Sequence, residues 1–180
     1  MRTPKLLHSP LASIRGRATW LESTGIVGGG SALGSTAAFL ARQPDYFSLS
    51  PQACEERYQW LSEGLGLGGE RAASVLAAEP PILTQAIDQL QLRASFFLQV
   101  VGGKPDELAA VPHMLTCDLA KVPMLRQAYC LAYGLDVSPA QLLTKGDVAF
   151  CDSVDGCDLE DLNEFEREGK HLSFFQGAEV

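Results

Sequence analysis

Long hydrophobic runs and paired cysteines are both missing from this 180-residue chain, and each absence removes a class of protein. No stretch reaches 18 consecutive apolar residues, so neither a membrane-spanning helix nor a membrane partner is expected. The five cysteines are odd in number and form no C-x-x-C pair, which favours reduced, mostly buried thiols over a disulfide framework. With 46% hydrophobic residues, the chain can nevertheless bury a sizeable core.

Motifs for catalysis or metal binding are also missing. The glycine-rich stretch 28–34 lacks the Gly-Lys-Ser/Thr of a phosphate-binding loop, and Leu33 stands where a dinucleotide fingerprint needs its third glycine, so a flexible loop is favoured. The aspartates within 152–158 resemble a calcium loop, but no glutamate follows at its twelfth position, which favours a solvated turn. The histidines are too scattered to form a metal site: His8, His113 and His171. We therefore expect no enzyme, cofactor or metal.

Charge is distributed unevenly along the chain. Residues 1–150 are nearly neutral, with 12 Lys/Arg against 13 Asp/Glu, whereas residues 151–180 have 2 against 9. No acidic residue occurs before Glu22, and this first stretch carries four basic ones. An arginine-bearing, acid-free N-terminus is typical of mitochondrial or plastid import, and a short disordered arm or the start of a truncated gene model are the alternatives.

A proline-led phrase occurs three times and is the most informative feature of the sequence. Two bulky apolar residues follow the proline closely, an arginine stands 13 or 14 positions after it, and another bulky residue stands at position 17. The prolines lie 36 and then 32 residues apart, a period that indicates stacked helical hairpins. The copies are Pro44, Tyr46, Phe47, Arg57 and Leu61; Pro80, Ile82, Leu83, Arg93 and Phe97; and Pro112, Met114, Leu115, Arg126 and Tyr129.

Apolar periodicity predicts helices and no strands. Long helices are expected over 51–65, 86–101 and 119–133, with Pro123 in a first turn or at a kink. Glycines follow each of them, and short helices are expected next, over 69–78, 105–110 and 139–143. The repeat prolines should each end a short helix. A shared core is expected to hold five side chains: Trp60, Phe97, Leu98, Tyr129 and Leu131.

The predicted fold class is therefore all-α, a superhelical stack of short helical repeats (an α-solenoid) of either hand. Residues 1–19 are expected to form a basic arm or transit-like segment, 20–150 the repeats, and 151–180 an acidic tail. An incomplete unit near Trp20 should open the array. A helix capped by Asp158 and bearing Leu159, Leu162 and Phe165 should close it.

Residues 20–175 resemble the mitochondrial transcription termination factor (mTERF) family. The similarity is carried by WLSEGLGLGGERAASVLAAEPPIL, FFLQVVGGKPDELAAVPHML and AYGLDVSPAQLLTKGDVAFC. The resemblance implies a curved superhelix of helical triplets whose inner surface binds nucleic acid, DNA or RNA, in mitochondria or chloroplasts. Members of the family act in organelle transcription, RNA maturation and ribosome assembly. This chain departs from the family in having fewer repeats, a neutral body and an acidic tail.

Three arginines occupy equivalent positions in the repeats and are candidates for phosphate contacts. Stacking would align Arg57, Arg93 and Arg126 in a ladder on one face, and arginine binds phosphate in two places. Three further basic residues would extend the track: Arg42, Lys121 and Lys145. If the ladder binds nucleic acid, replacing the three arginines by alanine should change stability little, since a surface arginine contributes mainly through its stem. The alternative is that the arginine stems cover the core while the guanidinium groups stay in water.

Two classes of function remain. The first is an organellar nucleic-acid-binding protein that regulates transcription or RNA maturation. The second is a non-catalytic protein-binding scaffold subunit of a larger assembly such as a mitochondrial ribosome, with the acidic tail docking on a basic protein partner. The charge of the inner face discriminates between them.

Overall fold

The computed structural model describes residues 11–27 and 35–174, and every regular element within these ranges is helical. The predicted all-α class is therefore confirmed for the described chain. It falls into two compact units, residues 1–90 and 91–180, with the boundary inside the helix Ile87–Ser95. The glycine-rich stretch 28–34, expected to be a loop, lies outside the described residues.

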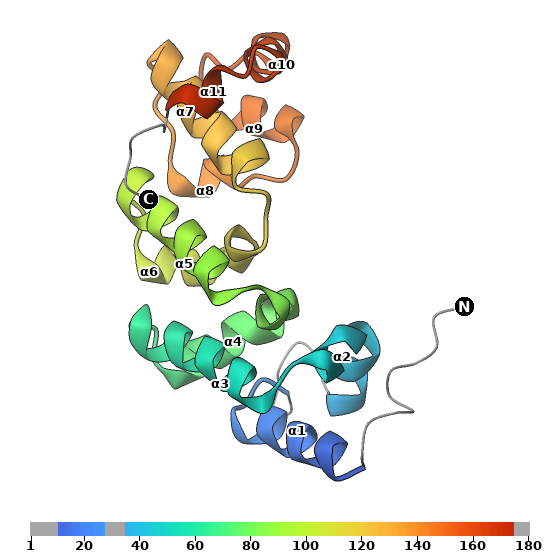
Figure 1. Cartoon of the computed structure of the whole chain (residues 1–180). Coiled ribbons are helices and arrows are strands. Elements are labelled where there is room, and N and C mark those ends of the chain that lie inside the picture. Colours follow the sequence, from blue (N-terminus) through green and yellow to red (C-terminus); the bar gives the residue numbers. More distant parts are fainter. Residues whose placement is uncertain (1–10, 28–34, 175–180) are drawn as a thin grey trace, which may run out of the picture. The chain divides into compact units, whose positions relative to one another are not determined.

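The N-terminal unit contains four α-helices and part of a fifth (Figure 1). Helix α1 spans Leu11–Ser23, so residues 11–19 of the expected arm are helical. The remaining elements of the unit follow in chain order: α2 (Thr36–Arg42), η2 (Pro44–Ser48), α3 (Pro51–Gln59), η3 (Trp60–Gly64), α4 (Gly69–Ala78), η4 (Pro80–Thr84) and the start of α5 (Ile87–Ser95).

The C-terminal unit repeats the same alternation of longer and shorter helices before a terminal group. Its elements, in chain order, are the end of α5, η5 (Phe96–Val100), α6 (Pro105–Ala110), η6 (Pro112–Leu115), η7 (Ala120–Met124), α7 (Leu125–Tyr133), α8 (Pro139–Leu142), α9 (Asp147–Ser153), α10 (Leu159–Arg167) and α11 (Lys170–Phe174). Asp158 caps α10 through hydrogen bonds from the amides of Glu160 and Asp161, as predicted.

The repeat prolines are placed as the sequence predicts. Pro44, Pro80 and Pro112 each begin a 3₁₀ turn two residues after a short helix ends. The preceding residues have nearly identical backbone angles, with φ between −124° and −130° and ψ between 60° and 69°. The clash of a proline ring with the residue before it excludes the helical conformation there, so the proline fixes the end of each short helix.

Long helices end, or in one case begin, in a π-helical turn, which sequence periodicity did not indicate. Helix α3 runs into η3, and α5 runs into η5. Before α7, Pro123 lies inside the π-helical turn η7. Proline cannot donate an amide hydrogen bond, and here the amide of Met124 donates to the Leu119 carbonyl instead, at 3.0 Å. The extra residue of a π turn thus accommodates Pro123 without a sharp break.

The expected core is partly confirmed. Phe97 and Tyr129 are buried. The Tyr129 ring meets the Phe165 ring edge to face, with the ring centroids 5.7 Å apart. Trp60 and Leu98 are only half-buried. The expectation for Leu131 is wrong, because this side chain is 55% exposed. It stands two residues beyond Tyr129 on α7, which places it on the opposite side of the helix.

Candidate functional site

The three repeat arginines do not present free guanidinium groups to solvent. Arg57 is 9% exposed, and its Nε donates to the Gln85 carbonyl at 2.7 Å while Nη1 donates to the Ala53 carbonyl. Arg93 is half-buried, and its Nε donates to the Cys117 carbonyl at 2.9 Å. Both side chains therefore reach across from a long helix to backbone that follows the next repeat proline.

Arg126 is the most deeply bound member of the set. Its side chain is 2% exposed. Nη1 donates to the carbonyls of Leu142 and Thr144, both at 2.7 Å, and Nη2 lies 2.8 Å from Oδ1 of Asp147. The Phe150 ring lies 4.7 Å from the guanidinium carbon. Contacts of this kind satisfy a buried cation without solvent.

These bonds follow one register rule. Each arginine donates one hydrogen bond to the carbonyl of the residue five positions after the proline of the next repeat. A fourth arginine that the sequence prediction did not include, Arg17, obeys the same rule at 2.7 Å. We call these four side chains the arginine clamps: Arg17 to Leu49 after Pro44, Arg57 to Gln85 after Pro80, Arg93 to Cys117 after Pro112, and Arg126 to Thr144 after Pro139.

The sequence does contain a signal for the role of Arg17. Pro4, Leu6, Leu7, Arg17 and Leu21 stand at the same offsets as the members of the first repeat phrase, so the phrase occurs a fourth time. This copy begins within the stretch interpreted as a basic arm or transit-like segment. A segment with that composition can hide a repeat, because the phrase consists of apolar and basic residues alone.

The alternative expectation, that the guanidinium groups of the repeat arginines stay in water, is wrong for the buried Arg57 and Arg126. A buried guanidinium bonded to backbone carbonyls cannot reach a phosphate unless those bonds break, and breaking them leaves buried acceptors unpaired. On the same ground we now expect substitution of Arg57 or Arg126 to lower stability, in place of the small change expected from the sequence. The hydrogen bonds give the repeated arginine a structural role that needs no nucleic acid.

The other candidate cations are few. Lys121 is exposed, and its Nζ lies 3.8 Å from a carboxylate oxygen of Asp118. Lys145 is exposed. Arg42 is the last residue of α2, and its side chain lies outside the part that the structure describes. The six expected phosphate-binding residues are therefore not seen as one exposed basic track among the described side chains.

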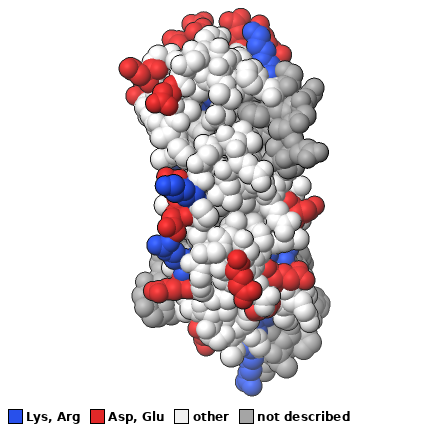
Figure 2. Space-filling view, turned by 90° about the vertical axis from the view of Figure 1, so that its left-hand side faces the viewer, with Lys and Arg blue, Asp and Glu red and all other residues white. Residues whose placement is uncertain are grey.

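Acidic side chains dominate the exposed surface of both units. Among described side chains of the N-terminal unit, the exposed acids are Glu22, Asp45, Glu56, Glu63, Glu70 and Asp88, against Arg15 and Arg71. In the C-terminal unit the acids are densest on α10 and its flanks (Figure 2, upper end): Asp158, Glu160, Asp161, Glu164, Glu166 and Glu168. Such surfaces repel phosphates and attract cationic partners.

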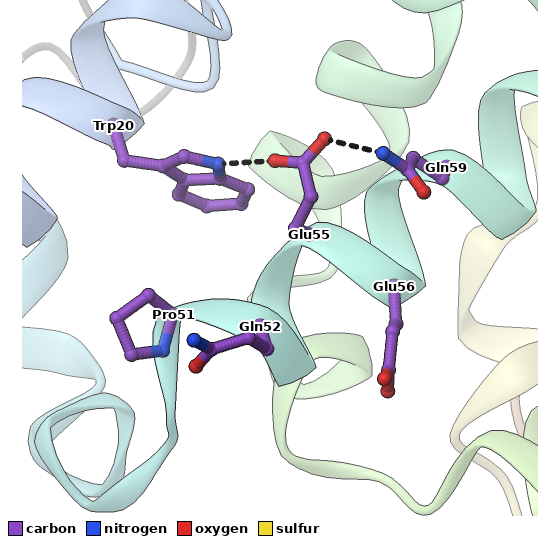
Figure 3. A pocket seen from close by; sticks show the side chains of 6 residues that line it. All are labelled: Trp20, Pro51, Gln52, Glu55, Glu56 and Gln59. Atoms are coloured by element: carbon purple, nitrogen blue, oxygen red, sulfur yellow. Dashed lines mark hydrogen bonds between the residues drawn. The ribbon is translucent and has the colours of Figure 1, made fainter.

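An open hollow of about 450 Å³ lies between α1 and α3 in the N-terminal unit (Figure 3). The Trp20 indole projects over the start of α3, and its Nε1 donates to Oε2 of Glu55 at 2.7 Å. Gln59 donates to the other oxygen of Glu55 at 3.0 Å. The remaining lining residues are Pro51, Gln52 and Glu56. The sequence carries no signal for this site, because Trp20 and Glu55 are 35 residues apart and share no motif.

Four of the five cysteines are not poised for nucleophilic chemistry. Burial raises the pKa of the Cys130 thiol to about 11, and it also raises the pKa of Cys54, Cys117 and Cys157. A thiol that keeps its proton at neutral pH is a weak nucleophile and a poor metal ligand. No group of metal-ligating side chains occurs among the described residues.

Comparisons with known proteins add no assignment. No protein-family model matches the chain, and no curated protein matches its sequence. Within the described residues, no helix is both long enough and apolar enough to cross a membrane.

Proposed function

We propose that this protein is a non-catalytic binding module whose acidic surface docks a basic protein partner within a larger assembly. One observation carries the proposal: each repeat arginine donates a hydrogen bond to a backbone carbonyl, and the exposed charge of the described residues is predominantly acidic. Complementary charge then steers a basic partner to the surface and suppresses acidic competitors.

We further propose that the helical repeats are those of an α-solenoid. The support is the arginine clamp rule, since four arginines at one register position each tie a long helix to the turn of the following repeat within the same compact unit. Such nearest-neighbour ties are what a repeat array needs, because each hairpin cannot bury its apolar face alone. The proline-led phrase and the resemblance to the mTERF family support the same arrangement. That resemblance is also the support for an organellar location.

Nucleic-acid binding is the competing proposal, and its support is the family resemblance. It would have to use exposed cations rather than the clamped arginines. Phosphate contacts supply most of the affinity in such proteins, and among the described side chains exposed acids far outnumber exposed cations. These cations are Arg15, Arg71, Lys104, Lys121, Lys145, Arg167 and Lys170. The geometry therefore favours a protein partner.

The test is a titration of the full chain with a fluorescein-labelled peptide of alternating arginine and glycine, followed by fluorescence anisotropy. We expect saturable binding that weakens between about 50 and about 200 mM salt. Neutralising acids of α10 and of its C-cap by Glu160→Gln, Glu164→Gln, Glu166→Gln and Glu168→Gln should weaken peptide binding. Absence of any peptide binding at the lower salt concentration would contradict the proposal.

A further inference from the structure

We propose that the hollow between α1 and α3 is a receptor for one arginine side chain of the partner protein. The inference rests on the proposed function and deepens it, since it names the chemical group that one place on the acidic surface recognises. The residues that carry it are Trp20, Glu55, Glu56 and Pro51.

The lining is charged with one sign only. Two carboxylates, Glu55 and Glu56, line the hollow, and none of its six lining residues is basic. A cation entering it therefore meets attraction without a competing positive charge from the lining. An anion or a phosphate would meet repulsion.

Glu55 is already oriented for such a cation. Each of its two oxygens accepts one hydrogen bond, from the Trp20 indole at 2.7 Å and from the Gln59 amide at 3.0 Å. A carboxylate has about four lone-pair sites, so each oxygen keeps acceptor capacity for an incoming donor. Because the carboxylate is fixed before binding, less conformational freedom is lost on complex formation.

The Trp20 indole is also held in place. Its ring meets the Tyr58 ring edge to face, with centroids 6.3 Å apart and planes at 82°, and its Nε1 is bonded to Glu55. Tryptophan is the aromatic side chain that attracts cations most strongly through its face. Figure 3 shows the indole from α1 and the Pro51 ring of α3 on the same side of the hollow, a pair of apolar surfaces for a methylene stem.

This combination selects arginine over other cations. A guanidinium is planar, stacks on an aromatic ring, and can offer parallel N–H groups to a carboxylate. A lysine ammonium is compact and strongly hydrated, and it cannot stack in this way. The hollow is open to solvent, and its volume of about 450 Å³ leaves room for one side chain with water.

The probe for this site is N-acetyl-arginine amide, and its neutral match is N-acetyl-citrulline amide. Trp20 and Trp60 are the two tryptophans of the chain, so a Trp60→Phe variant assigns the Trp20 indole N–H resonance in the ¹⁵N spectrum of the full chain. We expect a saturable shift of that resonance with the arginine probe at millimolar concentration. The citrulline probe should produce little shift, since it has the same shape without the charge.

Two variants locate the effect. Glu55→Gln keeps an acceptor for the Trp20 indole but loses the charge, and it should weaken the arginine probe about tenfold. Glu63→Gln removes an exposed acid that does not line the hollow, and it should leave the affinity unchanged. Equal shifts with both probes, or equal affinities of Glu55→Gln and the wild type, would overturn the inference.

The same variants separate this inference from the proposed function. If the arginine–glycine peptide binds the wild type and Glu55→Gln equally, the acidic surface docks a basic partner elsewhere and the hollow is not its receptor. If the peptide binds neither protein, the proposed function itself fails.

Discussion

Arg126 and Asp147 form an ion pair at 2.8 Å in which the guanidinium is buried and the carboxylate is partly exposed. The same guanidinium donates to the carbonyls of Leu142 and Thr144, so one side chain of α7 fixes the backbone from α8 to the start of α9. The same sequence pattern would be expected for a surface arginine that binds phosphate and for a buried arginine that stabilises the fold. The hydrogen bonds and the burial of Arg126 indicate the second role.

Replacing Arg126 by Met should destabilise the protein by about 3–5 kcal/mol, because the buried carbonyls lose their donor and the ion pair is broken. Asp147→Asn should cost less, about 1–2 kcal/mol, since the amide oxygen can still accept. Urea unfolding followed by circular dichroism measures both. Lys145→Ala, at an exposed position nearby, is the control and should stay within about 0.5 kcal/mol of the wild type. An Arg126→Met variant as stable as the control would show that the clamp contributes nothing.

Substituting Gly102 or Gly103 by alanine should lower stability for different physical reasons. A Cβ at Gly103 would overlap the Phe97 ring, so Gly103→Ala should cost about 1–3 kcal/mol through overpacking. Gly102 has open space but a φ of +75°, so alanine there should cost about 1–2 kcal/mol through backbone strain alone. Gly16→Ala is the opposite case. Gly16 lies inside α1, and a Cβ added there would meet nothing within 4 Å, so alanine should stabilise the protein by about 0.5–1 kcal/mol. Thermal unfolding of the three variants gives the order.

Stability should fall at alkaline pH in part because of Cys130. Its folded pKa is about 11 and its ordinary value 9.0, so the burial contribution is fully present below pH 9 and is lost as the pH rises toward 11. In that window the unfolded chain holds fewer protons than the folded one, which makes the slope negative, at most about 1.4 kcal/mol per pH unit for this group. Urea unfolding at a series of pH values up to that window, under reducing conditions, measures it. Cys130→Ala should have a shallower decline, and an unchanged slope would assign the effect to other groups.

Local chemistry explains why the helix boundaries could be predicted. Pro80 excludes helix from Glu79, and Gly134 adopts the left-handed conformation that ends α7, so single residues decide where these elements stop. Helices α4 and α6 accordingly have the predicted bounds.

The candidate site could not be predicted in the same way, because it depends on tertiary contacts between residues far apart in the sequence. An arginine beside a helix can send its head to solvent or to a neighbouring carbonyl, and sequence spacing does not distinguish the two outcomes for Arg57. The hollow needs the approach of Trp20 to Glu55 from another helix, which depends on packing rather than on any local pattern.

The most direct test of the central claim compares nucleic acid with a basic peptide on one preparation of the full chain. Fluorescein-labelled duplex DNA, single-stranded RNA and the arginine–glycine peptide would each be titrated at about 50 and about 200 mM salt. An acidic surface with clamped arginines predicts that the peptide binds at the lower salt concentration, weakens at the higher one, and that neither nucleic acid saturates. Saturable binding of DNA or RNA, with a salt slope that falls by about one unit on Lys121→Ala or Lys145→Ala, would contradict the account and establish a phosphate-binding surface.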